Sequence, residues 1–420
     1  MEDRNLNGNT DSLGNAGVSA NEEHKDWQKK IVLFLAGQSV SIFGSSLTQY
    51  AIIWYITLTT QSGIMMTISA LCTFLPMIAV SFFAGVWADR YNRKILIIAS
   101  DVLTAVSTLI LALFFFFGYR EMWLLFLVSG IRSIGSGIQS PAVTAMIPQI
   151  VPMEKLTKVN GFNGSIQSLI LLISPAVSGL LLSISNIESA FFVDVFTAAI
   201  AVLIMLSLKL PIHAKAAQAQ TTSYIEDLKA GLRYVLESNL IKAFFIFYAV
   251  FFFLIVPAAY LTPLMVARTF GDEVWRLTAI EVAFSAGSIL GGVLIAIWGG
   301  FKNKTHTIAL ACSAFGVLTC ALGFTAFFPI YLVIMGVTGI TLPVFSTPAT
   351  VFFQERVDKD MHGRVFGLLQ IVSTTAMPLG MVIFGPAADI VKVELLLIGS
   401  GVLLFALSVY VYFNRHFKAA

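Results

Sequence analysis

Four ionisable side chains stand inside long apolar stretches of this sequence: Asp101, Arg132, Asp194 and Glu281. Ionisable groups are costly in a membrane interior, and those that persist there commonly serve transport or proton transfer. A desolvated carboxyl group favours its protonated form, so Glu281 and Asp194 are candidates for carrying a proton. Arg132 lies near the middle of its apolar stretch. The alternatives are a structural role for each residue and, for Glu281, a position at the membrane interface.

A second cluster lies directly between two apolar stretches and reads Gly85-Val-Trp-Ala-Asp-Arg-Tyr-Asn-Arg-Lys94. A carboxylate at Asp89 can bond the free amide groups at another helix's N-terminus, or a cation there, only while that helix is close. A contact that forms in one state and breaks in another is what a gate requires. Asn92 is expected to adopt a left-handed backbone in a short turn. A plain membrane anchor would explain the basic residues alone, which are Arg90, Arg93 and Lys94.

Composition identifies the chain as a membrane protein. Its 420 residues are 57% hydrophobic and 12% charged, with a mean hydropathy of +0.85, whereas soluble domains carry about 25% charged residues. The three cysteines, Cys72, Cys312 and Cys320, fall inside apolar stretches, which indicates small buried side chains rather than disulfides. The sequence predicts no metal site and no cofactor.

About 20 apolar residues are needed for a helix to cross a bilayer, and twelve windows meet this length. The sequence therefore predicts an all-α membrane protein with twelve transmembrane helices in two six-helix bundles. The expected spans are about 31–58, 63–87, 95–118, 122–147, 162–185, 190–210, 240–266, 277–298, 307–328, 330–353, 365–388 and 395–412.

The basic residues predict the orientation. With the N-terminus inside, 21 Lys and Arg residues fall in inner segments and 4 in outer loops, so both termini are expected in the cytoplasm. The polar segment 1–26 is expected to be a disordered cytoplasmic tail. The N-terminal bundle then covers 27–210, a cytoplasmic linker 211–239, and the C-terminal bundle 240–420.

The linker carries one helical pattern. Apolar residues at 225, 228, 232, 235 and 236 form a stripe with charges opposite, which predicts an amphipathic helix over 224–236. We expect it to lie on the inner membrane surface between the two bundles. A site for a calmodulin-type partner is the alternative.

The two halves of the chain are related in sequence. Ser140-Pro-Ala recurs as Thr347-Pro-Ala, Lys158-Val-Asn-Gly recurs as Arg364-Val-Phe-Gly, and Ser174-Pro-Ala recurs as Gly385-Pro-Ala, with offsets of 206 to 211 residues. Because six spans separate the copies, both halves have the same topology. This is the parallel-repeat plan of two-bundle transporters, in which the binding site lies between the halves.

The cluster after the second span resembles the signature of the major facilitator superfamily. Gly85, Asp89, Arg90, Arg93 and Lys94 match Gly-x-x-x-Asp-Arg-x-(Gly)-Arg-Lys, with Asn92 in the usual glycine position. A second, degenerate copy resembles it at Gly299–Lys304. The whole sequence, including Gly363–Gly367, resembles bacterial macrolide-type drug exporters, with siderophore exporters as relatives.

This resemblance implies roles for particular residues. Asp89 would hold the eleventh helix near Arg364 and close the inside. Arg132 resembles the buried arginine of proton-coupled members, and 174–179 resembles the antiporter motif of span five. The family's geometry places spans three and six at the periphery, which favours structural roles for Asp101 and Asp194.

Several residues are expected to line a substrate cavity. Gln38 and Gln49 supply polarity to the first span, span seven is rich in phenylalanine, and aromatic side chains commonly line apolar ligand sites. The scarcity of buried charge favours a neutral or lipophilic cargo. The cavity candidates are Gln38, Gln49, Phe251, Ser174 and Pro175.

These observations predict a proton-coupled exporter of lipophilic drugs in the plasma membrane, with antibiotic resistance as the consequence. Phosphate-binding loops and hydrolytic triads are absent, so the sequence predicts neither an enzyme nor an ATP-driven motor. The expected partners are a small lipophilic substrate, protons and membrane lipid, with no nucleic acid, and the chain is expected to be a monomer. The alternatives are a siderophore or metabolite exporter, or a non-transporting receptor that docks onto an ATP-driven pump.

Overall fold

The computed structural model describes residues 10–208 and 224–414, and this part of the chain is built of helices without strands. Eleven helical segments within it are long and apolar enough to cross a membrane. The remaining long helix, α4 (Met122–Ile150), is continuous, but serines, Gln139 and Arg132 interrupt its apolar sequence. It packs among its neighbours like the other helices. The predicted all-α fold with two bundles is confirmed, and the protein crosses the membrane many times.

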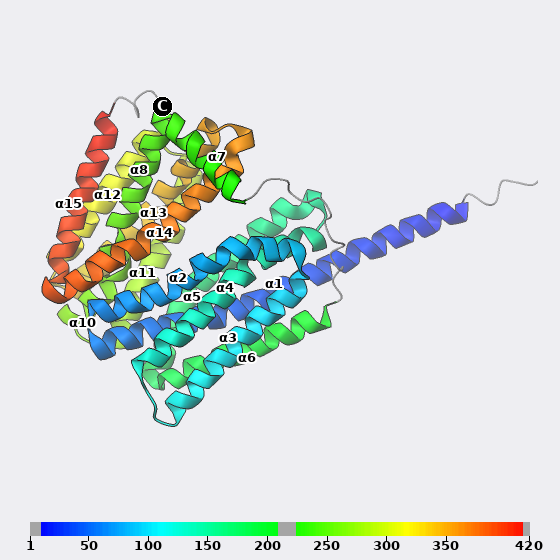
Figure 1. Ribbon diagram of the computed structural model, residues 1–420, viewed down its shortest axis with the longest axis horizontal. Coiled ribbons are helices and arrows are strands. Elements are labelled where there is room, and N and C mark those ends of the chain that lie inside the picture. The colour runs from blue at the N-terminus through cyan, green and yellow to red at the C-terminus, as the bar shows by residue number, and fades with distance from the viewer. Residues whose placement is uncertain (1–9, 209–223, 415–420) are drawn as a thin grey trace, which may run out of the picture.

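The helices form two groups that are consecutive in the chain (Figure 1). The N-terminal bundle contains α1 (Thr10–Thr60), α2 (Gly63–Arg90), α3 (Arg93–Phe116), α4, α5 (Leu156–Ile184) and α6 (Ile187–Ser207). The C-terminal bundle contains α8 (Asn239–Leu254), α9 (Val256–Tyr260), α10 (Thr262–Thr269), α11 (Val274–Trp298), α12 (Lys304–Phe324), α13 (Phe328–Arg356), α14 (His362–Ile390) and α15 (Val393–Phe413).

Packing within the two bundles follows one scheme. In the first bundle α2 and α3 pack on α4, and α3 packs on α6; in the second, α11 and α12 pack on α13, and α12 packs on α15. A short 3-10 turn precedes α5 (Met153–Lys155), and another precedes α14 (Lys359–Met361). The recurrence supports the internal repeat inferred from the sequence.

The first helix begins earlier than expected. Residues 10–26 extend α1 as a helix, where a disordered tail was predicted, and this extension projects away from the bundles (Figure 1). Adding residues to an existing helix costs less than starting one, and the sequence holds no proline between residues 10 and 60. The prediction relied on the polar composition of this segment, which argues against an isolated helix more strongly than against the extension of an existing one.

The seventh span is broken, whereas the sequence predicted one helix over 240–266. The breaks lie at Ile255 and Leu261, each close before a proline, Pro257 and Pro263. Proline lacks an amide hydrogen and its ring conflicts with the carbonyl four residues earlier. Three short helices, α8, α9 and α10, therefore cross the membrane in place of one.

Asparagine begins a helix at equivalent places in the two halves. Asn92 has an extended backbone, and its side chain accepts a 3.0 Å hydrogen bond from the Lys94 amide at the start of α3. Asn303 accepts a 2.9 Å bond from the Thr305 amide at the start of α12. The predicted left-handed conformation at Asn92 is therefore wrong, because the side chain acts as an N-cap.

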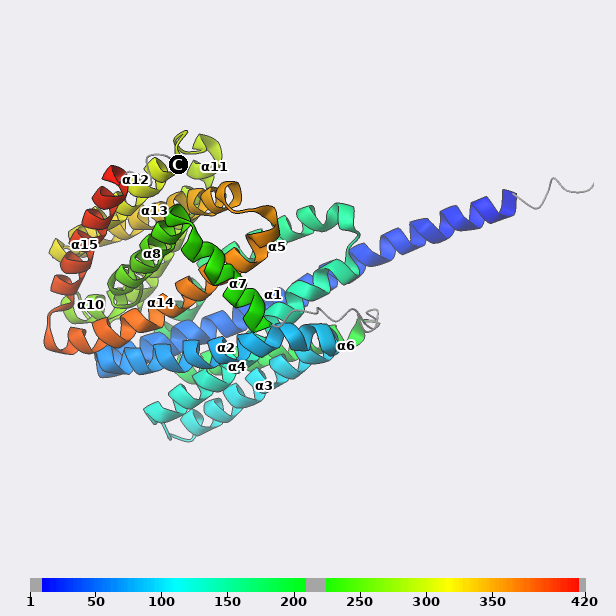
Figure 2. The same ribbon diagram turned by 45° about the horizontal axis from the view of Figure 1, so that its top comes forward.

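Helix α7 (Tyr224–Glu237) forms where the amphipathic pattern predicted it, and one side of its described part packs against protein. Gly231 lies against Arg364 and Leu368 of α14, and Val235 is buried. The Tyr234 hydroxyl accepts a 3.1 Å hydrogen bond from the Asp358 amide. Figure 2 shows α7 crossing over α14. One side of α7 thus packs on the C-terminal bundle, while Leu232 and Leu236 are 49% and 53% exposed. The expected position on the membrane surface stays a prediction, and residues 209–223 of the linker lie outside the described part of the chain.

The two membrane faces differ in how the bundles meet. We call the end where α1 enters and α15 finishes the terminus face, and the other end the opposite face. At the opposite face α2 lies along α14 and α5 along α11. A Cβ added to Gly63 would lie 2.0 Å from the Gly385 carbonyl oxygen, and Thr67 donates a 2.9 Å bond to the Met381 carbonyl. The bundles are in close contact there.

Candidate functional site

A cavity of about 760 Å³ lies between the two bundles. Helices α1, α2, α4 and α5 line one side, and residues from each of the helices α8 to α14 line the other. Asn163 and Gln167, from the first half of α5, extend the lining toward the terminus face. Space for water and ligand thus lies at the interface between the repeats, where parallel-repeat transporters bind their cargo.

Two of the five predicted cavity residues line this cavity, Gln38 and Gln49. Phe251 does not. Its ring is fully buried in the C-terminal bundle and stacks on Phe345, with 3.8 Å between ring centroids. The neighbouring Phe252 faces the cavity instead, because successive residues of a helix point about 100° apart.

Ser174 and Pro175 are also buried away from the cavity. The Ser174 hydroxyl has no hydrogen-bond partner among the described residues. The cavity lining from α5 comes from earlier in the helix and ends at Leu171. The prediction that Ser174 and Pro175 line the cavity is therefore wrong for this conformation, since both residues are buried outside it.

Arg132 and Asp194 form a buried ion pair between α4 and α6. Arg132 also donates to Thr108 of α3, and its second terminal nitrogen donates a 3.1 Å bond to the Ser45 carbonyl of α1. The Ser45 hydroxyl donates a 3.2 Å bond to the other oxygen of Asp194. Arg132 lines the cavity while Asp194 is fully buried. One guanidinium therefore joins four helices. Because it lines the cavity and is ion-paired with Asp194, a change of charge in the cavity can act on this buried carboxylate.

Asp101 is the second buried acid of the N-terminal bundle. It accepts hydrogen bonds from the Ser41 hydroxyl at 2.7 Å and from the Gln139 side-chain amide at 2.8 Å. The same Gln139 amide lies 3.2 Å from the Gln38 side-chain oxygen. Gln38 and Gln139 both line the cavity, so a chain of polar groups connects Asp101 to it. The second oxygen of Asp101 has no partner among the described residues.

Glu281 lines the cavity from α11 in the other bundle. No hydrogen bond or ion pair joins its carboxyl group to another described residue. Of the described residues that line the cavity, Glu281 is the only acid and Arg132 the only base. Three of the four ionisable residues predicted from the sequence thus lie in the N-terminal bundle, where Arg132 pairs with Asp194 and Asp101 is connected to the cavity through Gln139. Glu281 lies on the other side of the cavity.

The basic residues of the Gly85–Lys94 cluster bind the ends of helices in their own bundle. The Arg93 guanidinium donates 2.7 Å bonds to the carbonyls of Ala88 and Ala145. The Lys94 ammonium donates a 2.8 Å bond to the Leu208 carbonyl. Cations stabilise the free carbonyl groups at helix C-termini. These two side chains therefore hold α2, α4 and α6 together at the terminus face, whereas Arg90 is exposed.

The two bundles are apart at the terminus face. A Cβ added to Gly85, Gly161 or Gly367 would meet no atom within 4 Å. Asp89 lies in the last turn of α2, and its side chain is outside the described part of the structure. The contact of Asp89 with the helix near Arg364 stays a prediction, since it belongs to a conformation in which this face is closed.

At the opposite face an acid that the sequence reading missed closes the cavity. Asp389, in the last turn of α14, accepts bonds from the N-terminus of α2: the Gly63 amide at 2.7 Å, the Ile64 amide at 2.9 Å and the Ser62 hydroxyl at 2.8 Å. Arg268 of α10 adds a 2.9 Å ion pair to the same carboxylate. We call this set of contacts the Asp389 latch.

A sequence signal for the latch exists. An acid in the last turn of a helix faces the negative end of the helix dipole, which is unfavourable unless a partner compensates it. Asp389 is the penultimate residue of α14, as Asp89 is of α2. Asp389 therefore has the same features as Asp89: a carboxylate at the end of one helix that can bond the free amide groups at the start of another.

Comparisons with known proteins agree with this architecture. The family model described as Major Facilitator Superfamily matches residues 33–381. Macrolide efflux protein A of Streptococcus pyogenes is 29% identical over 391 residues, covering 92% of this chain and 96% of that protein. The Staphyloferrin A transporter of Staphylococcus aureus is 21% identical, covering 92% and 96%.

Solved structures share the fold at low identity. A crystal structure of a bacterial homologue of the iron transporter ferroportin, in an inward-facing state, gives a TM-score of 0.67 at 14% identity, covering 91% of this chain and 98% of that one. The nucleoside transporter NupG gives 0.65 at 16% identity, covering 91% and 98%.

Proposed function

We propose that this chain, which belongs to the major facilitator superfamily, exports a lipophilic small molecule from the cell in exchange for protons. It is a transporter and not an enzyme, as are the relatives and structural neighbours named above. The plasma membrane is the proposed location, with the terminus face toward the cytoplasm, on the strength of the basic residues in the loops on that side.

One observation carries the proposal of alternating access. The cavity reaches toward the terminus face, where the bundles are apart, while the Asp389 latch and the contact between Gly63 and Gly385 close the opposite face. Rocking of the two bundles about this cavity would close one face and open the other. In that second conformation Asp89 would bond the start of α14, as the resemblance to the family implies.

Similarity to a known exporter and the ionisable groups of the cavity support the proposed cargo and its coupling to protons. Macrolide efflux protein A resembles the chain over nearly its whole length, which favours export of an antibiotic-like molecule. Glu281 and the Arg132–Asp194 pair are the groups proposed to couple transport to protons, because both are in or next to the cavity. The membrane potential contributes about 2.3 kcal/mol per charge per 100 mV, so one proton can drive substantial accumulation.

A siderophore exporter is the second candidate. The similarity to the Staphyloferrin A transporter favours it. Glu281, the acid that lines the cavity, would repel a strongly anionic cargo when it is ionised, which disfavours this candidate. A receptor that docks onto an ATP-driven pump would bind cargo without moving it.

Inside-out vesicles from a pump-deficient bacterial host test the proposal. We expect uptake of a radiolabelled macrolide that depends on an acidic vesicle interior and stops when a protonophore is added. Arg132→Ala is expected to abolish the proton-driven uptake, while Arg120→Ala, which removes a loop ion pair with Glu188 outside the cavity, should retain it. Binding without uptake would contradict the proposal and favour the receptor, and uptake of a siderophore alone would favour the second candidate.

A further inference from the structure

The charge balance of the central cavity points to a class of cargo. Arg132, the only base among the described residues of its lining, is already paired with Asp194. Glu281, the only acid of that lining, is paired with no described residue. When Glu281 is ionised, the cavity therefore has a net negative charge that no described protein group neutralises.

Aromatic side chains surround the same space. Tyr50 and Trp54 of α1 lie with their rings 5.6 Å apart, and both line the cavity, as do Tyr260 of α9 and Phe284 of α11. The faces of aromatic rings attract cations, and most strongly where water is excluded. A carboxylate among such rings suits a cation whose charge is covered by apolar groups, while a small hydrated cation would lose its water without enough compensation.

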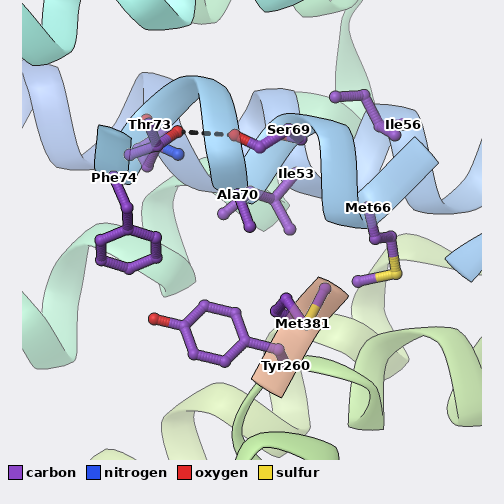
Figure 3. Close-up of a pocket in the computed structure, with 10 residues that line it drawn as sticks. Ile53, Ile56, Met66, Ser69, Ala70, Thr73, Phe74, Tyr260 and Met381 are labelled. Atoms are coloured by element: carbon purple, nitrogen blue, oxygen red, sulfur yellow. Dashed lines mark hydrogen bonds between the residues drawn. The ribbon is translucent and has the colours of Figure 1, made fainter. Parts of the chain in front are cut away.

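An apolar side pocket adjoins the cavity. It has a volume of about 190 Å³ and lies between α1, α2, α9 and α14, with Met66, Ala70, Phe74 and Met381 on its walls (Figure 3). Tyr260 closes one side, its ring 6.0 Å from that of Phe74. A dry cavity of about 150 Å³ is large enough for benzene, so this pocket can hold one aromatic ring or a branched alkyl group.

The side pocket and the cavity form one continuous site. Gln49, Ile53, Thr73 and Tyr260 line both, and Glu281 lies in the cavity with Tyr260. A molecule with a positive charge and an apolar arm can therefore place the charge at Glu281 and the arm between α2 and α14.

We propose that the cargo is a lipophilic cation, with Glu281 as its counter-ion and the side pocket as the site of its apolar arm. This rests on the proposed function for the identity of the site but is tested by binding alone. A proton and the cation occupy the same carboxylate in turn. When the cation binds, a protonated Glu281 releases its proton to water in the cavity, and no other bond changes. Competition of this kind links cargo binding to proton release.

The test uses tetraphenylphosphonium, a lipophilic cation without a dissociable proton, and triphenylphosphine oxide, a neutral molecule of similar build. Their binding to the purified full-length protein is measured in lipid nanodiscs without any gradient. Glu281→Gln is expected to weaken tetraphenylphosphonium binding at least tenfold and to leave the neutral probe unchanged. Glu273→Gln, an exposed acid just before α11, serves as the matched control and should change neither.

A second variant tests the side pocket. Ala70→Phe fills it and is expected to weaken both probes, because both carry phenyl groups, whereas Glu281→Gln weakens only the charged one. Binding of tetraphenylphosphonium should also strengthen as the pH rises, since protons compete for Glu281, and this dependence should vanish in Glu281→Gln. The other ionisable groups that face the cavity are Tyr50, Tyr260 and Arg132.

Either of two results would overturn the inference: equal tetraphenylphosphonium affinity in the native protein and Glu281→Gln, or equal losses for both probes in that variant. The outcome is separable from that of the proposed function. Proton-driven uptake in vesicles, together with probe binding that is unchanged in Glu281→Gln, would support the proposed function and contradict this inference. Binding that depends on the charge of the probe and on Glu281, without uptake, would support the inference and contradict the proposed function.

Discussion

At the residue scale, one buried cation joins four helices of the N-terminal bundle. Arg132 binds Asp194, Thr108 and the Ser45 carbonyl, and thereby connects α1, α3, α4 and α6. Burying two charges is costly, and an ion pair in such a place is weak evidence of stabilisation compared with apolar packing. A role in transport that requires charged groups therefore explains the Arg132–Asp194 pair better than a contribution to the stability of the fold.

Removing one charge of this pair separates stability from function. Arg132→Met leaves Asp194 unpaired and should lower the free energy of unfolding by about 3–5 kcal/mol, measured by thermal unfolding in detergent. Adding Asp194→Leu should restore most of that loss, because no buried charge remains. Proton-driven uptake is expected to stay absent in the double variant. A double variant with normal uptake would reduce the pair to a structural element.

The two helix caps give a second residue-scale prediction. Asn92→Ala and Asn303→Ala each remove a side-chain acceptor from a helix N-terminus, which typically costs about 1 kcal/mol. Faster hydrogen exchange in the first turn of α3 or α12 is the expected result. Asn186→Ala is the matched control, since Asn186 precedes α6 without making a side-chain cap, and equal effects at all three positions would contradict the assignment.

At the element scale, sequence patterns predicted the helices well and their interruptions less well. The apolar windows locate the spans because a bilayer demands about 20 apolar residues in a row. The breaks at Ile255 and Leu261 depend on how Pro257 and Pro263 are accommodated, and membrane helices often tolerate proline without breaking. Which phenylalanine of α8 faces the cavity depends on the rotation of the helix in its bundle, which the apolar run around Phe251 does not encode.

Interfaces between bundles were the least predictable elements. Gly85, the first residue of the signature, has open space beside it in this conformation, whereas Gly63 touches the backbone at Gly385. A glycine in an apolar span carries no information on which neighbour it meets. The candidate cavity residues were predicted best where a polar group stands out in an apolar helix, as at Gln38 and Gln49, and Glu281, a candidate proton carrier, lines the same cavity.

Close packing of α2 on α14 can be tested with one methyl group. A Cβ at Gly63 would lie 2.0 Å from a backbone oxygen, so Gly63→Ala should prevent the opposite face from closing as it does here. Spin labels at exposed Trp123 and Phe327, one in each bundle near that face, are expected to move apart in a variant free of native cysteines. Gly292→Ala, where a Cβ meets nothing within 4 Å, should leave the label distance unchanged; unaltered distances in Gly63→Ala would contradict the close approach.

At the scale of the whole molecule, α2 and α14 form a reciprocal pair. Asp389 near the end of α14 caps the start of α2 at the opposite face. Asp89 occupies the same place near the end of α2 at the terminus face, and we expect it to bond the start of α14 once that face closes. Each helix would then end in an acid suited to the other's N-terminus, with only one of the two contacts present at a time. The two closed states would compete through similar interactions.

This reciprocity predicts opposite shifts for the two matching variants. A carboxylate at a helix N-terminus contributes about 0.3–2 kcal/mol, and a difference of 1–2 kcal/mol changes a population ratio about five- to thirty-fold. Asp389→Asn should therefore lengthen the distance between labels at Trp123 and Phe327 and shorten that between Met153 and Ile297, two exposed residues near the terminus face. Asp89→Asn should do the opposite and slow transport more than it weakens cargo binding.

The double variant makes the prediction stringent. If the two acids act on the same equilibrium from its two sides, Asp89→Asn combined with Asp389→Asn should return the population ratio toward that of the native protein, while transport stays slow or leaky because neither face closes firmly. Asp272→Asn, an exposed acid in the loop before α11, controls for loss of charge at the opposite face. Shifts of the same sign in both single variants would mean that the acids stabilise one state together, and the alternating latch would have to be abandoned.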